Sequence, residues 1–175
     1  MARLNWMLTF AVIAAIAVLL APVPAGASVP SQELDHALRT IFKRVDREGN
    51  GRTSAAEINR YVASVFAAMD RNHDEQVSRT EFEEFSPALL ALAQRYGRTH
   101  AYDEALGRIF RRWRSAGTGT LNRLTFRSGV KGELAAAARG SLALNYDQFI
   151  RARFMRELAA ALRPGGGHRS RASQG

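Results

Sequence analysis

Two twelve-residue segments rich in oxygen-bearing side chains constrain the fold of this chain more than any other feature. The first, DREGNGRTSAAE, runs from Asp46 to Glu57, and the second, DRNHDEQVSRTE, runs from Asp70 to Glu81. They start 24 residues apart, so one helix must both leave the first segment and enter the second. At ~1.5 Å per residue that helix holds the segments ~18 Å apart. The spacing therefore predicts that the two segments do not pair with each other.

Apolar residues recur with helical spacing before and between the two segments. Before the first segment they are Leu34, Ala37, Leu38, Ile41, Phe42 and Val45, and between the segments they are Ile58, Tyr61, Val62, Val65, Phe66 and Met69. Each segment is therefore expected to be a loop between two amphipathic helices.

The first loop carries oxygen donors at positions 1, 3, 5 and 12, and Gly51 stands at position 6, where the chain must turn through positive φ. A hard cation such as Ca²⁺ takes about six to eight oxygen ligands, and this spacing wraps them around one point. The predicted ligands are Asp46, Glu48, Asn50, the backbone carbonyl of Arg52, and Glu57 through both oxygens, with Ser54 ligating directly or through a water.

The second loop repeats this pattern. Its predicted ligands are Asp70, Asn72, Asp74, the backbone carbonyl of Gln76, and Glu81, with Ser78 at position 9 ligating directly or through a water. Val77 at position 8 suits a short β-bridge, and Phe82 is expected to anchor the following helix in the core.

The two segments resemble the calcium-binding loops of the EF-hand family. The resemblance implies an all-α fold of helix–loop–helix repeats that binds about two Ca²⁺ ions per chain. Three residues depart from the family pattern: Glu48 at position 3, Thr53 at position 8, and Glu75 in place of glycine at position 6. These departures indicate weakened rather than abolished binding. The alternative is that both segments are acidic helix-cap turns that bind no ion.

The second half of the chain repeats the first without the ligands. DHALRTIFKRVD, from Asp35, matches DEALGRIFRRWR, from Asp103, at an offset of 68 residues. The third loop, Arg114 to Thr125, then has no carboxylate, and the fourth, near Ala138 to Gln148, is one residue short. Neither is expected to bind Ca²⁺. Residues 28–98 are thus interpreted as an EF-hand pair and residues 99–163 as a degenerate EF-hand-like repeat.

The two ends of the chain are interpreted as lying outside this fold. Residues 1–27 carry one cation, a 16-residue apolar run from Trp6 to Ala21, and a small-residue site at Ala25 to Ala27. This pattern is typical of a signal peptide cleaved after Ala27, and it predicts a periplasmic or secreted protein. The alternative is an uncleaved membrane anchor. Residues 164–175 have no apolar pattern and are expected to be a disordered basic tail.

Charge is distributed unevenly between the halves. Residues 29–85 carry a net charge of −3 and residues 86–175 a net charge of +11. An alternative function follows, in which the basic half binds a protein partner or an anionic membrane surface and calcium is only structural. The arginines of one helix are candidates for that surface: Arg108, Arg111, Arg112 and Arg114. The repeat instead makes this helix the entry helix of the third unit, with its apolar stripe in the core.

Several functional classes are not expected. The chain has no cysteine, which excludes disulfides and thiolate chemistry. It contains no catalytic motif and no nucleic-acid motif, so neither an enzyme nor a nucleic-acid partner is predicted. For the calcium sites, two roles stay open: a structural or buffering role, and a sensor that exposes an apolar surface to an unidentified protein partner.

Overall fold

The computed structural model describes residues 28–85, 87–115 and 117–163. The predicted signal segment and the predicted tail lie outside these residues. In chain order the elements are α1 (Ser31–Val45), β1 (Arg52–Ser54), α2 (Ala55–Met69), β2 (Gln76–Val77), α3 (Arg79–Glu84), α4 (Pro87–Arg95), α5 (Thr99–Trp113), β3 (Leu121–Asn122), α6 (Arg123–Ala138), β4 (Ala143–Asn145), α7 (Tyr146–Ile150) and α8 (Arg153–Leu162). The strands are two or three residues long, so the predicted all-α class is confirmed.

The order of elements in the first half recurs in the second. The run α1–β1–α2–β2–α3–α4 is followed by α5–β3–α6–β4–α7–α8. We call the segments between the helices loop 1 (Asp46–Glu57), loop 2 (Asp70–Glu81), loop 3 (Arg114–Thr125) and loop 4 (Ala138–Gln148). Each loop contains one of the short strands and runs into the first turn of the next helix.

The helix that follows each loop starts at a capping box dictated by local sequence. The N-cap side chain accepts the backbone N–H three residues later, and that residue's side chain accepts the N-cap N–H in return. The four pairs are Ser54 with Glu57, Ser78 with Glu81, Asn122 with Thr125, and Asn145 with Gln148. The cap geometry is therefore common to all four loops, although only loops 1 and 2 place a carboxylate in it.

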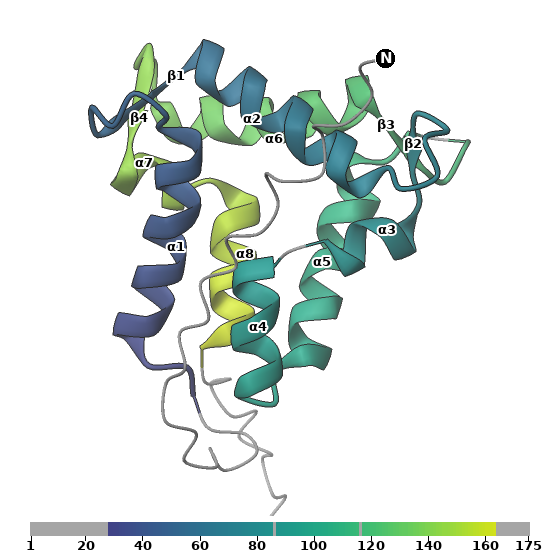
Figure 1. Cartoon of the computed structure of the whole chain (residues 1–175), viewed down its shortest axis with the longest axis horizontal. Helices are drawn as coiled ribbons and strands as arrows, with labels where there is room; N and C mark the ends of the chain where they lie inside the picture. Colours follow the sequence, from purple (N-terminus) through teal and green to yellow (C-terminus); the bar gives the residue numbers. More distant parts are fainter. Residues whose placement is uncertain (1–27, 86, 116, 164–175) are drawn as a thin grey trace, which may run out of the picture.

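The loops pair across the two halves of the chain. In β1–β4 Thr53 lies opposite Leu144, and in β2–β3 Val77 lies opposite Leu121; both pairs are antiparallel. Helices α2 and α6 run side by side, with the β1–β4 pair at one end and the β2–β3 pair at the other (Figure 1). The prediction that loops 1 and 2 do not pair with each other is confirmed.

The two halves share one hydrophobic core. The apolar stripes predicted for α1 and α2 lie in it, with Ile41, Tyr61 and Val65 half-buried at its margin. Phe82, expected to anchor the helix after loop 2, packs against Phe110 and Trp113 of the second half. Residues 28–98 and 99–163 therefore fold onto each other rather than as separate bodies.

Helix α5 has the orientation that the sequence repeat favoured. Its Ile109, Phe110 and Trp113 are buried in the core. Among the arginines considered for a surface role, Arg112 is instead drawn inward, where its guanidinium pairs with Glu133 at 2.8 Å and with Glu157 at 3.2 Å. Among the described helices, none is long and apolar enough to cross a membrane.

Candidate metal centres

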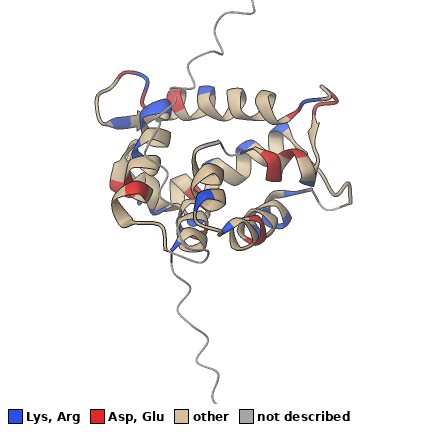
Figure 2. Ribbon diagram, turned by 60° about the horizontal axis from the view of Figure 1, so that its bottom comes forward, with Lys and Arg blue, Asp and Glu red and all other residues tan. Residues whose placement is uncertain are grey.

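Loops 1 and 2 lie at the two ends of α2, and their acidic residues are grouped there (Figure 2). Loop 1 joins α1 to α2 and loop 2 joins α2 to α3. Because each loop starts at a helix end and finishes in a capping box, both of its ends are fixed by hydrogen-bonded structure.

Loop 1 folds around the carboxylate of Asp46, a residue that is 7% exposed. Its Oδ1 accepts the N–H of Asn50 at 3.1 Å, and its Oδ2 accepts the N–H of Gly51 at 2.8 Å. The side-chain oxygen of Asn50 accepts the N–H of Arg52 at 2.9 Å. Positions 1 and 5 thus direct their oxygens toward the turn of the loop.

Loop 2 repeats these hydrogen bonds position for position. The carboxylate of Asp70 accepts the N–H of Asp74 and the N–H of Glu75, each at 3.1 Å. The carboxylate of Asp74 accepts the N–H of Gln76 at 2.8 Å. Two unrelated acidic turns would have no reason to share this pattern, so the loops adopt one common conformation.

The glutamates at position 12 also point back into their loops. Glu57, 1% exposed, accepts the N–H of Ser54 at 2.8 Å and the N–H of Glu48 at 3.2 Å. Hydrogen bonds from the backbone and hydroxyl of Ser54, together with that from Glu48, lower the pKa of Glu57 to about 2. Glu81 accepts the N–H of Ser78 and of Arg71, and the bonds from Ser78 likewise lower its pKa. Both glutamates are therefore anionic at neutral pH.

The position-3 side chains are less firmly held. Glu48 is exposed and accepts a hydrogen bond from the amide of Asn50 at 3.2 Å. Asn72 accepts the N–H of Asp74 at 3.2 Å and donates to the Asp74 carboxylate at 2.9 Å. In the described part of the chain, no three His, Asp or Glu side chains are already gathered as a metal cluster.

The remaining predicted donors lie where the loops become strands and helices. Arg52 and Gln76 open β1 and β2, and only their backbone carbonyls were predicted to ligate. The side chain of Gln76 is engaged separately, accepting a hydrogen bond from Thr120 of loop 3 at 2.6 Å. Ser54 and Ser78 are the N-caps.

Backbone conformation repeats at positions 4 and 6. Loop 1 uses Gly49 and Gly51 there, with φ of 68° and 77°, and loop 2 uses His73 and Glu75, with φ of 60° and 63°. The positive φ expected at Glu75 is confirmed. The positive φ at His73 was not predicted, although His73 aligns with Gly49, a residue type that favours positive φ.

Loop 3 shows the same backbone without the charge. Gly117 and Gly119 have φ of 105° and 73° at positions 4 and 6, and Thr125 occupies position 12. In loop 4 the residue equivalent to position 12 is Gln148, also uncharged. Loop 3 has no carboxylate, and the only one in loop 4 is that of Asp147, beside Gln148, so neither loop carries the acidic pattern of loops 1 and 2.

The donors of loops 1 and 2 fit a hard divalent cation. All of them are oxygens, which suits Ca²⁺ or Mg²⁺ rather than metals that favour nitrogen or sulfur. Each ionised carboxylate has about four lone-pair sites, so Asp46 and Glu57 keep acceptor capacity beyond the backbone N–H groups they already bind. Residues 46–57 and 70–81 are therefore the candidate metal centres.

Comparison with known proteins adds no relative to this argument. No family model matches the chain, and the curated proteins and the solved structures contain no significant match.

Proposed function

We propose that this protein is a calcium-binding protein of the EF-hand type, exported to the periplasm or secreted, and that it binds two Ca²⁺ ions per chain. The observation that supports this best is the shared hydrogen-bond pattern of loops 1 and 2, in which positions 1, 5 and 12 present carboxylate or amide oxygens inward. Glu57 and Glu81 would each close one site.

Calorimetry with Ca²⁺ on the purified chain tests this proposal. The unchanged chain should bind two ions, and Glu57→Gln and Glu81→Gln should each remove one, because an amide supplies neither the charge nor the second carboxylate oxygen. Glu104→Gln, on the exposed face of α5, is the matched control and should still bind two. Native mass spectrometry that finds three or four specific ions, or an unchanged stoichiometry in Glu57→Gln, would overturn the assignment.

Selectivity follows from the same donors. A bidentate glutamate and a flexible shell favour Ca²⁺, whereas Mg²⁺ demands a tight octahedron and releases its waters reluctantly. Ca²⁺ should therefore bind more tightly than Mg²⁺ to the unchanged chain. Equal affinities would argue that Glu57 and Glu81 do not ligate.

An apolar cavity in the core favours the sensor role over simple buffering. It has a volume of about 140 Å³, and its lining includes Met69, Phe82 and Trp113. The helices that leave loops 1 and 2 both contribute to it, so a movement of these helices on ion binding would change its opening. A dye that fluoresces on apolar surfaces should brighten on adding Ca²⁺ to the unchanged chain. No change would favour a structural or buffering role.

A further inference from the structure

A second cavity lies away from loops 1 and 2, between the end of α6 and the start of α8. Its volume is about 350 Å³, within the size range of small-molecule sites. The lining residues are Gly132, Glu133, Ala136, Ala137, Arg139, Arg151, Arg153 and Arg156. We call this cavity the arginine pocket. Its walls are small side chains and its charge is carried by four guanidinium groups.

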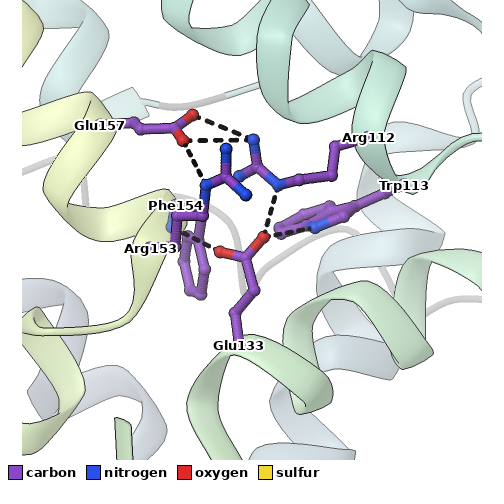
Figure 3. Close-up of polar contacts among 6 residues, drawn as sticks. All are labelled: Arg112, Trp113, Glu133, Arg153, Phe154 and Glu157. Atoms are coloured by element: carbon purple, nitrogen blue, oxygen red, sulfur yellow. Dashed lines mark hydrogen bonds and ion pairs between the residues drawn. The ribbon is translucent and has the colours of Figure 1, made fainter. Parts of the chain in front are cut away.

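The single carboxylate in the lining does not neutralise these arginines. Glu133 Oε1 accepts hydrogen bonds from Arg112 Nε at 2.8 Å and from Trp113 Nε1 at 2.9 Å. Its Oε2 accepts the N–H of Phe154 at 2.6 Å. Figure 3 shows both oxygens engaged in this way. The charge of Glu133 is thus compensated by Arg112 of α5, which does not line the pocket.

Three of the four pocket arginines have unused charge and donors. Arg153 pairs with Glu157 at 2.9 Å, and Glu157 is shared with Arg112. The backbone N–H groups of Arg151 and Arg156 are hydrogen-bonded, but the guanidinium groups of Arg139, Arg151 and Arg156 make no hydrogen bond or ion pair with any residue that the structure describes. Cations gathered around one cavity repel one another unless an anion lies between them.

The position of these residues on α8 strengthens the argument. Arg153 is the first residue of α8 and Arg156 lies in the same opening turn. Backbone N–H groups give a helix start partial positive charge, so cations there are unfavourable and an anion is favoured. Arg139 suits the C-terminal end of α6, but Arg153 and Arg156 lie at the end of α8 where the helix dipole disfavours a cation.

We propose that the arginine pocket binds the phosphoryl group of a phosphoester anion. A planar guanidinium matches the oxygens of a phosphate in a two-point hydrogen bond, and three unpaired guanidiniums suit a multiply charged group. This inference is independent of calcium binding, because no residue of loop 1 or loop 2 lines the pocket.

Calorimetry with pyrophosphate tests the pocket, in low salt and with a chelator present to exclude calcium. The double variant Arg139→Gln/Arg156→Gln should bind pyrophosphate about tenfold or more weakly, because two charge-assisted contacts are lost. The matched control is Arg60→Gln/Arg108→Gln, which removes the same charge from exposed arginines of α2 and α5. It should bind like the unchanged chain, and circular dichroism should show that both variants are folded.

Two results would overturn the proposal. One is the absence of pyrophosphate binding by the unchanged chain. The other is equal weakening in the pocket variant and the control, which would show attraction by overall charge alone.

The phosphoryl group would belong either to a lipid headgroup or to a soluble phosphoester, and vesicle binding distinguishes the two. Leu142 is 96% exposed and follows Arg139 by three residues, so it could enter a bilayer beside the pocket. Binding to phosphatidylglycerol vesicles that pyrophosphate displaces and Leu142→Asn weakens would identify a lipid headgroup. Pyrophosphate binding without vesicle binding would identify a soluble phosphoester. Vesicle binding that is equal in pocket variant and control would count against the pocket.

Discussion

At the scale of single residues, loop 2 reproduces with ordinary side chains a backbone that loop 1 makes with glycine. His73 and Glu75 have φ of 60° and 63°, where Gly49 and Gly51 stand in loop 1. A residue with a Cβ pays ~1 kcal/mol or more for this conformation. Loop 2 therefore stores strain that loop 1 does not.

Replacing Glu75 with glycine should tighten calcium binding at loop 2 roughly fivefold, the equivalent of ~1 kcal/mol of relieved strain. The side chain of Glu75 is exposed, so the loss of its screened charge should cost less than this. Calorimetry measures the change in Kd. Glu75→Ala is the control, because it removes the same charge but keeps the Cβ, and it should show no tightening. Weaker binding by Glu75→Gly would mean that the assignment of positions in loop 2 is wrong.

At the scale of elements, the helices could be predicted from the sequence, but the contacts between elements far apart in the sequence could not. The stripe from Leu34 to Val45 defines α1 because burial and helical period agree along one face. The pairing of Thr53 with Leu144 joins residues 91 apart, and it depends on how α2 and α6 lie together. The arginine pocket was missed for the same reason, since Arg139 and Arg151 meet only through the fold.

The contact of α6 with α5 depends on the absence of a side chain at Gly129. A Cβ there would lie 2.4 Å from the ring of Trp113, too close for a rigid indole to accommodate without movement. Gly129→Ala should therefore destabilise the protein by about 1–3 kcal/mol. Gly132→Ala, three residues along the same helix, meets nothing within 4 Å and should stabilise it by about 0.5–1 kcal/mol through helix propensity. Urea unfolding of both variants is the measurement. Equal effects would show that α5 and α6 do not pack in this way.

The contact of α1 with α7 should depend on pH. Tyr146 Oη donates to Asp35 at 2.7 Å, and this bond, with a second from Arg39, lowers the pKa of Asp35 below its ordinary 3.8. Burial, and then the bond to Asp35, raises the pKa of Tyr146 above 10.0. The bond between Tyr146 and Asp35 therefore stabilises the fold fully between the ordinary pKa values of the two groups, 3.8 and 10.0. It is lost as pH falls through the lowered pKa of Asp35 or rises through the raised pKa of Tyr146.

Tyr146→Phe tests this dependence. The variant should melt below the unchanged chain at pH 7, and the difference should shrink at a pH below the lowered pKa of Asp35, where the protonated carboxyl no longer accepts the bond as an anion. Asp35→Asn should remove the pH dependence of that difference. A difference that stays constant from pH 7 into acid would show that the carboxylate makes no contribution.

At the scale of the whole molecule, each loop with a glutamate at position 12 is joined to a loop with an uncharged residue there. Loop 1 pairs with loop 4 and loop 2 with loop 3, and the two halves share one core. The second half places its apolar residues in the same core, although Thr125 and Gln148 stand where the first half has Glu57 and Glu81. Ion binding that orders loop 1 or loop 2 is therefore expected to change the packing of the opposite half.

Trp113 offers a direct measurement of that communication. It lies in the second half, but its ring contacts Phe82, 6.3 Å away between centroids, and Phe82 directly follows Glu81 of loop 2. Ion binding through Glu81 should shift Phe82 and change the fluorescence of Trp113. Trp6 lies in the predicted signal segment, so the chain that starts after Ala27 has Trp113 as its sole tryptophan, and a calcium titration of that chain should alter the emission. The response should survive Glu57→Gln and disappear in Glu81→Gln. A response that needs Glu57 instead would mean that the halves communicate through the β1–β4 end of the molecule.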